Sequence, residues 1–126
     1  MSNLLYRQHI VDHYQNPRHF GRMPKPTWSA EASNPLCGDK LTLYVSADDE
    51  GKIYDISFAG EGCAISMASA SMLLEKVSET GMGMRDLLAV SPSYIYELLG
   101  VPISAAREKC ALLILSTIKT QDTVLR

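Results

Sequence analysis

A glycine turn leads into a helix in the stretch Gly60-Glu61-Gly62-Cys63-Ala64-Ile65-Ser66-Met67-Ala68-Ser69-Ala70-Ser71. The helix has one apolar face with i, i+4, i+7 spacing, made of Cys63, Met67, Ala70, Leu74 and Val77. The pattern therefore predicts a thiol at the start of a helix, where unpaired N–H groups and the helix dipole favour thiolate. A thiolate attacks sulfur electrophiles and binds metals. The alternative is a cysteine that only fills the core.

The whole chain has the composition of an ordinary globular protein. Its 126 residues predict a single domain spanning 1–126, and a net charge of −2 gives no basic excess that would indicate nucleic-acid binding. It contains no apolar run long enough for a membrane span, and the stretch Met1–Arg7 does not resemble a signal peptide. We therefore expect a cytoplasmic protein. Three cysteines, an odd number, favour thiol or metal chemistry over a disulfide framework.

The N-terminal quarter predicts a helix, a loop and a short strand. Asn3 is placed to cap a helix that stops at Asn16-Pro17. Its polar residues include His9, Asp12 and His13, which we expect on a solvated face rather than at a ligand site. A loop over 18–26 then leads to an edge strand over 28–32.

The next segment places a thiol and a carboxylate on one strand. Alternation predicts a strand from Cys37 to Val45 with one face made of Cys37, Asp39, Leu41, Leu43 and Val45. A carboxylate on an apolar face is costly unless it is paired, and a metal ion would pair it; the alternative is that Asp39 closes a turn after Gly38. A turn over 48–51 and a returning strand over 52–59 predict an antiparallel hairpin, which brings Cys63 near Cys37 and Asp39.

The C-terminal part predicts short helices over 84–89 and 93–99 and one last helix from Ala105 to about Thr120. That helix has an apolar face of Cys110, Leu113, Ile114, Thr117 and Ile118. Arg107 lies three residues before Cys110 and is predicted on the same side, where a cation would steady a sulfur anion. The alternative for Arg107 is a solvated residue of the first turn.

Three thiols and one carboxylate thus come together from three elements: the strand that holds Cys37 and Asp39, and the two helices that hold Cys63 and Cys110. A set of four sulfur and oxygen ligands suits tetrahedral Zn²⁺, and thiolates also suit an iron–sulfur cluster. No two cysteines form a CxxC pair, so the alternative of a plain α/β domain without a metal stays open.

Several motifs, in order along nearly the whole chain, resemble those of the IscU/SufU/NifU-N iron–sulfur cluster assembly proteins. They are Leu5-Tyr6-Arg7-Gln8, Asp12-His13-Tyr14-Gln15-Asn16-Pro17-Arg18, Asn34-Pro35-Leu36-Cys37-Gly38-Asp39, Gly62-Cys63-Ala64-Ile65-Ser66 with Ala68-Ser69, and Arg107-Glu108-Lys109-Cys110-Ala111. The resemblance implies an α+β fold of the SufE/NifU-like type. In that fold a three-stranded antiparallel sheet carries an N-terminal helix and C-terminal helices on one face.

The resemblance also implies a ligand set of Cys37, Asp39, Cys63 and Cys110, with Cys37 as sulfur acceptor and Arg107 as the assisting cation. In the IscU branch these ligands hold a [2Fe–2S] cluster, and a histidine precedes the last cysteine where this chain has Lys109. In the SufU branch they hold zinc, and Arg-x-Lys-Cys is usual. The chain is SufU-like in motif, but the stretch 78–104 is too short for the SufU insertion.

The implied function is iron–sulfur cluster assembly with sulfur delivered as persulfide. The implied partners are a cysteine desulfurase of the SufS or IscS type and a downstream scaffold or apo-protein acceptor. If the chain is an enzyme, the resemblance implies a zinc-dependent sulfurtransferase that builds no cluster itself. A zinc-stabilised interaction module without sulfur traffic is the remaining alternative.

Overall fold

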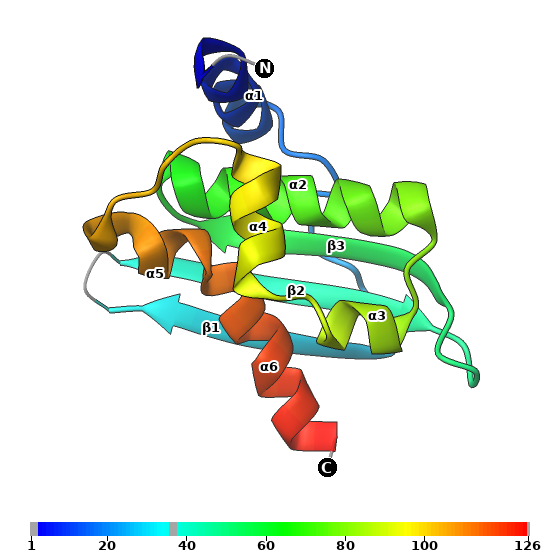
Figure 1. The fold of residues 1–126 in the computed structure, drawn as a ribbon. Coiled ribbons are helices and arrows are strands. Elements are labelled where there is room, and N and C mark those ends of the chain that lie inside the picture. The colour runs from blue at the N-terminus through cyan, green and yellow to red at the C-terminus, as the bar shows by residue number, and fades with distance from the viewer. Residues whose placement is uncertain (1–2, 36–37, 126) are drawn as a thin grey trace.

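The computed structural model describes residues 3–35 and 38–125, which form an antiparallel sheet with helices on one face (Figure 1). The strands follow one another in the order β1-β2-β3. Their bounds are β1 Trp28–Asn34, β2 Asp39–Ala47 and β3 Ile53–Glu61. The predicted α+β class and three-stranded sheet are confirmed.

The register of the sheet brings three chain segments to one end. Asn34 pairs with Asp39, and Lys40 pairs with Glu61. On β2, alternation buries Leu41, Leu43 and Val45 completely against the helices, as the sequence predicts. The start of β2 and the end of β3 therefore lie side by side, and β3 continues two residues beyond its predicted end at residue 59.

The helices have the bounds α1 Asn3–Gln15, α2 Ala64–Thr80, α3 Met84–Leu88, α4 Pro92–Leu99, α5 Glu108–Ala111 and α6 Leu113–Leu125, and a 3₁₀ turn, η1, spans Ala105–Arg107. The single last helix predicted over 105–120 is wrong. It is divided at Leu112, whose φ of −100° and ψ of 6° interrupt the regular helix. Among the described residues, no helix is both long enough and apolar enough to cross a membrane.

Helix α1 lies mainly on α2 and forms a further layer outside the sheet (Figure 1). It buries Ile10 and His13, whereas its larger apolar side chains Leu4, Leu5, Val11 and Tyr14 stay exposed. The expectation that His13 belongs to a solvated face is therefore wrong: this side chain is only 4% exposed.

The outer edge of β3 is covered by the loop that follows α1. Phe20 forms an isolated parallel bridge with Phe58, in which Gly21 N–H donates to the Phe58 carbonyl and Phe58 N–H donates to the His19 carbonyl. The two phenyl rings meet edge to face with centroids 5.2 Å apart. The loop is thus held to the sheet by both backbone and aromatic contacts.

Candidate metal centre

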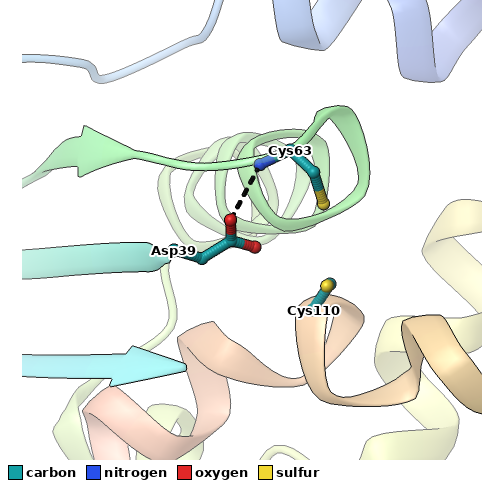
Figure 2. A group of neighbouring side chains, drawn as sticks. All are labelled: Asp39, Cys63 and Cys110. Carbon is teal, nitrogen blue, oxygen red and sulfur yellow. Dashed lines mark hydrogen bonds between the residues drawn. The ribbon is translucent and has the colours of Figure 1, made fainter. Parts of the chain in front are cut away.

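Asp39, Cys63 and Cys110 converge where β2, α2 and α5 meet (Figure 2). Asp39 is the first residue of β2, Cys63 caps the N-terminus of α2, and Cys110 lies in α5. One carboxylate oxygen and the two sulfurs all lie within 4.8 Å of one another. Asp39 and Cys110 are buried, at 3% and 2% exposure, and Cys63 is half-buried. Solvent therefore reaches the site at Cys63, whereas Asp39 and Cys110 are shielded from it.

A hydrogen bond from a backbone N–H to a side-chain carboxylate joins β2 to the start of α2. The N–H of Cys63 donates to Oδ1 of Asp39 across 3.2 Å, which gives the negative carboxylate a place at the positive end of α2. Cys63 has extended backbone angles, φ −73° and ψ 171°, and its side chain makes no capping bond. Figure 2 shows its sulfur turned toward Asp39 and Cys110 instead.

The turn before Cys63 needs its two glycines for different reasons. Gly60 takes a φ of +144°, the positive value that the sequence predicts for this turn. At Gly62 the need is space, because a Cβ there would lie 2.3 Å from Ser66 Oγ and 3.3 Å from Asp39 Cγ. A side chain at position 62 would therefore collide with Ser66 and crowd Asp39, which both lie near the sulfur of Cys63.

The donor set fits a metal ion. Tetrahedral Zn²⁺ with bonds of about 2.0–2.3 Å requires ligand atoms about 3.3–3.8 Å apart, so the three described ligand atoms need only small closing movements from their present separations. Thiolate sulfur together with carboxylate oxygen suits zinc and also suits iron in a cluster. The donors alone do not select between them.

Cys37 and Arg107 are also predicted as site residues. Cys37 lies outside the described residues. Arg107 ends the 3₁₀ turn η1, and its side chain is exposed; its role beside the thiol of Cys110 stays a prediction. Lys109 is also exposed and lines a cavity of about 450 Å³ together with Asn34 and Pro35.

Sequence reasoning missed Ser66, whose hydroxyl is fully buried beside Cys63. A serine three residues into a helix is too common to be singled out by pattern. Only the folded structure shows that Ser66 lies beside Gly62 and the sulfur of Cys63.

A second polar group, which we call the polar junction, consists of Asp12, His13, Arg18, Ser71 and Glu75. His13 Nδ1 lies 2.7 Å from Ser71 Oγ, and the N–H of Arg18 donates to the same oxygen across 2.8 Å. The Arg18 guanidinium pairs with Asp12 at 2.6 Å and with Glu75 at 3.5 Å. The motif Asp12–Arg18 thus fastens α1 to α2, and none of its contacts with the described residues involves the metal centre.

Two pKa values in the polar junction are shifted. Burial lowers the pKa of His13 below its usual 6.5, with the Arg18 charge acting in the same direction. The hydrogen bond from Arg18 is the main reason that the pKa of Asp12 is lowered. Near neutral pH the junction therefore holds a neutral imidazole between charged neighbours.

Comparison with known proteins places the chain in a family. Residues 5–121 match the model of the NifU-like N terminal domain. The chain is 37% identical to the zinc-dependent sulfurtransferase SufU of Bacillus subtilis, over 86% of this chain and 83% of that protein. It is 32% identical to the iron–sulfur cluster assembly scaffold protein IscU of Haemophilus influenzae, over 92% of this chain and 91% of that protein.

Among solved structures, the putative scaffold protein for the SUF system from Fervidobacterium islandicum superposes with a TM-score of 0.71 at 27% identity. The superposition covers 95% of this chain and 98% of that one. With the family model matched from residue 5 to residue 121, the chain belongs to the NifU-like N-terminal domain family.

Proposed function

We propose that this protein assembles iron–sulfur clusters, accepting persulfide sulfur from a cysteine desulfurase and serving as cluster scaffold or sulfur carrier. The observation that carries the proposal is the convergence of Asp39, Cys63 and Cys110 within 4.8 Å. Relatives named for cluster assembly and for sulfur transfer support it. We assign the ligand set as Cys37, Asp39, Cys63 and Cys110.

The composition of the site favours ligand exchange over a permanent structural metal. Purely structural zinc sites are built from cysteine and histidine, whereas this site includes a carboxylate. A carboxylate oxygen is a harder donor than sulfur and leaves a soft metal more readily. Cys63 is only half-buried, so an incoming ligand has access from that side. These features suit a centre whose cargo must enter and leave.

Sulfur acceptance is assigned to Cys37. Its thiolate attacks the terminal sulfur of the desulfurase persulfide, and a new S–S bond forms on Cys37. The original S–S bond breaks at the same time, and the desulfurase cysteine leaves as a thiolate. No net oxidant or reductant is needed. A bound metal keeps the cysteines deprotonated near neutral pH, and Arg107 is assigned as the cation that steadies the sulfur anion.

A second candidate is a zinc-dependent sulfurtransferase that passes sulfur on without building a cluster. Two observations favour it: the similarity to the SufU protein of Bacillus subtilis and the lysine, Lys109, directly before Cys110. Lysine is cationic at neutral pH and a poor metal ligand. Its side chain is exposed, at the mouth of the cavity beside Asn34.

The test combines purified protein, a cysteine desulfurase with its pyridoxal phosphate, cysteine and ferrous iron under anaerobic conditions. Visible absorption follows cluster formation, and elemental analysis counts zinc, iron and acid-labile sulfide. Sulfide-to-iron charge-transfer bands with bound iron and sulfide would establish a scaffold. Retained zinc with persulfide on Cys37 and no visible chromophore would establish the sulfurtransferase.

One further outcome contradicts both. If zinc is retained, no persulfide forms on Cys37 and removal of the zinc by a chelator unfolds the domain, the metal is structural. The proposal of sulfur traffic would then be wrong.

A further inference from the structure

The hydroxyl of Ser66 lies within hydrogen-bond distance of the sulfur of Cys63. Ser66 lies at the third position of α2 and has no exposed surface. Its Oγ lies 3.7 Å from the Sγ of Cys63 and 3.1 Å from the Cys63 carbonyl oxygen. In this arrangement the thiol donates to the hydroxyl oxygen, and the hydroxyl donates to the carbonyl.

This arrangement changes when the sulfur becomes a thiolate, because the S–H donor is then lost. A half-buried thiolate is stabilised by hydrogen-bond donors, and a hydroxyl can act as one by rotating about its C–O bond. The Oγ–Sγ distance of 3.7 Å falls within the range for a hydrogen bond to sulfur. Ser66 can therefore keep a hydrogen bond with the sulfur of Cys63 after deprotonation, with the hydroxyl as donor and the thiolate as acceptor.

The rotation leaves no group unsatisfied. The Cys63 carbonyl also accepts the helical N–H of Met67, across 3.1 Å. That bond persists when the Ser66 hydroxyl turns away, so the carbonyl keeps a donor. The space for the hydroxyl depends on Gly62, where any Cβ would lie 2.3 Å from Oγ. Gly62 thus leaves the space in which the Ser66 hydroxyl lies beside the sulfur of Cys63.

We infer that Ser66 is a positioning residue for the metal-bound sulfur of Cys63, donating a hydrogen bond from Oγ to Sγ once the thiol has lost its proton. This inference rests on the proposed metal centre. Hydrogen bonds from the outer shell orient ligands and tune the metal, and removing one costs about 10-fold or more in metal affinity. The bond also draws charge from sulfur and so raises the energy of sulfur-to-metal charge transfer.

The helix offers a matched control in Ser69. Its side chain is equally buried, and its hydroxyl donates to the carbonyl three residues earlier, that of Ser66, across 3.1 Å. In the described structure that hydroxyl makes no hydrogen bond to the sulfur of Cys63 or Cys110. Ser66→Ala and Ser69→Ala therefore remove the same kind of helix hydrogen bond, but only the first removes the contact with Cys63.

The experiment loads the wild type and both variants with Co²⁺. It records the sulfur-to-cobalt charge-transfer band and the rate of Co²⁺ loss to excess EDTA. For Ser66→Ala we expect a band at longer wavelength and loss about 10-fold faster, with Ser69→Ala matching the wild type. Circular dichroism and melting of the metal-free proteins check that both variants fold.

Equal spectra and equal rates in the wild type and Ser66→Ala would overturn the inference, as would equal changes in the two variants. A different failure belongs to the proposed function. If the wild type binds neither Co²⁺ nor Zn²⁺, the metal centre itself is wrong and the role of Ser66 falls with it.

Discussion

The N–H of Cys63 donates to Oδ1 of Asp39, so the residue that begins β2 holds the residue that caps α2. A carboxylate has two oxygens, so one can accept the hydrogen bond from the Cys63 N–H while the side chain also binds a metal. In the proposed centre the same aspartate bonds the start of α2 in the metal-free protein and would also be a ligand of the bound metal. Its two roles can be separated by substitution.

Asp39→Asn keeps an acceptor for the Cys63 N–H and removes the charge, whereas Asp39→Ala removes both. We expect both variants to release bound metal or cluster several-fold more slowly than the wild type. Exchange must then begin by breaking a stronger metal–thiolate bond. Chelator-driven release, followed by absorbance, measures the rate. Only Asp39→Ala should also lose about 1.5–3 kcal/mol in the unfolding free energy of the metal-free protein. Release as fast as in the wild type would refute the role of a labile ligand.

Cys37→Ala is expected to abolish persulfide acceptance from the desulfurase, because no other thiol is assigned as the attacking nucleophile. Mass spectrometry of the intact protein under non-reducing conditions detects the added sulfur. Arg107→Ala should slow acceptance while Arg107→Lys retains most of it, since a cation is what the role requires. Persulfide formed in Cys37→Ala at the wild-type yield would show that another cysteine accepts the sulfur.

Gly62→Ala is expected to weaken Co²⁺ retention, because its Cβ would lie 2.3 Å from Ser66 Oγ. Adding Ser66→Ala removes the hydroxyl with which that Cβ collides. The loss in the double variant should therefore be smaller than the product of the two single losses, as expected for residues in contact. Co²⁺ titration of the four proteins completes the cycle. Independent effects would show that the crowding at Gly62 does not act through Ser66.

Gly81→Ala and Gly100→Ala are expected to differ in stability although both glycines end helices in the left-handed conformation, with φ of 70° and 69°. A Cβ at Gly81 meets nothing within 4 Å, whereas one at Gly100 would lie 1.9 Å from the ring of Tyr6. Gly81→Ala should cost about 1–2 kcal/mol of unfolding free energy. Gly100→Ala should cost clearly more, because α1 is displaced.

Urea denaturation of the two variants measures this difference. Repeating Gly100→Ala in a Tyr6→Ala background should return its cost to that of Gly81→Ala. If Gly100→Ala costs no more than Gly81→Ala even with Tyr6 present, the contact between the ring and the glycine does not hold α1 in place.

His13 should make the stability of the metal-free protein depend on pH below neutrality. Its pKa is lowered by burial in the folded protein, so the unfolded chain binds the proton more readily. The contribution of His13 is complete above the unfolded pKa of 6.5 and is lost as the pH falls through the lower folded pKa. Urea denaturation between pH 7 and pH 5 should therefore show falling stability. The groups whose charges act on the ring are Asp12, Arg18 and Glu75 of the polar junction, and to the least degree His9.

The controls use the second histidine of the same helix. His13→Gln should flatten the pH dependence, whereas His9→Gln, at an exposed position, should change it far less, because the charge of His9 ranks last among the influences on the pKa of His13. Equal slopes in all three proteins would mean that the titration of His13 is not coupled to folding.

The sheet and the convergence at its end could be predicted because their signals are local and regular. Alternation on β2 assigns Leu41, Leu43 and Val45 to the core, and an antiparallel hairpin necessarily brings the start of β2 to the end of β3. The glycine turn then carries Cys63 to Asp39. The approach of Cys110 followed from the family resemblance and from the apolar face that it shares with Ile114.

The packing of α1 could not be predicted in the same way. Hydrophobicity favours burial of Leu4, Leu5 and Val11, but the structure buries His13. The buried imidazole is satisfied by Ser71, 58 residues away, and no pattern within the helix contains that partner. The break at Leu112 was missed for a related reason. No residue there is a glycine or proline that would mark a break, and α5 and α6 share α2 as a neighbour while only α6 also packs on β1 and β2.

The bridge between Phe20 and Phe58 also affects whether another strand can pair with the outer edge of β3. A strand at the edge of a sheet offers unpaired backbone groups to any passing chain, and such edges are where aggregation begins. At Phe58 the outward N–H and carbonyl are already bonded to residues 19 and 21 of the same molecule. A foreign strand that approached β3 would first have to displace this loop. Strand addition at the outer edge of β3 is thereby hindered at Phe58.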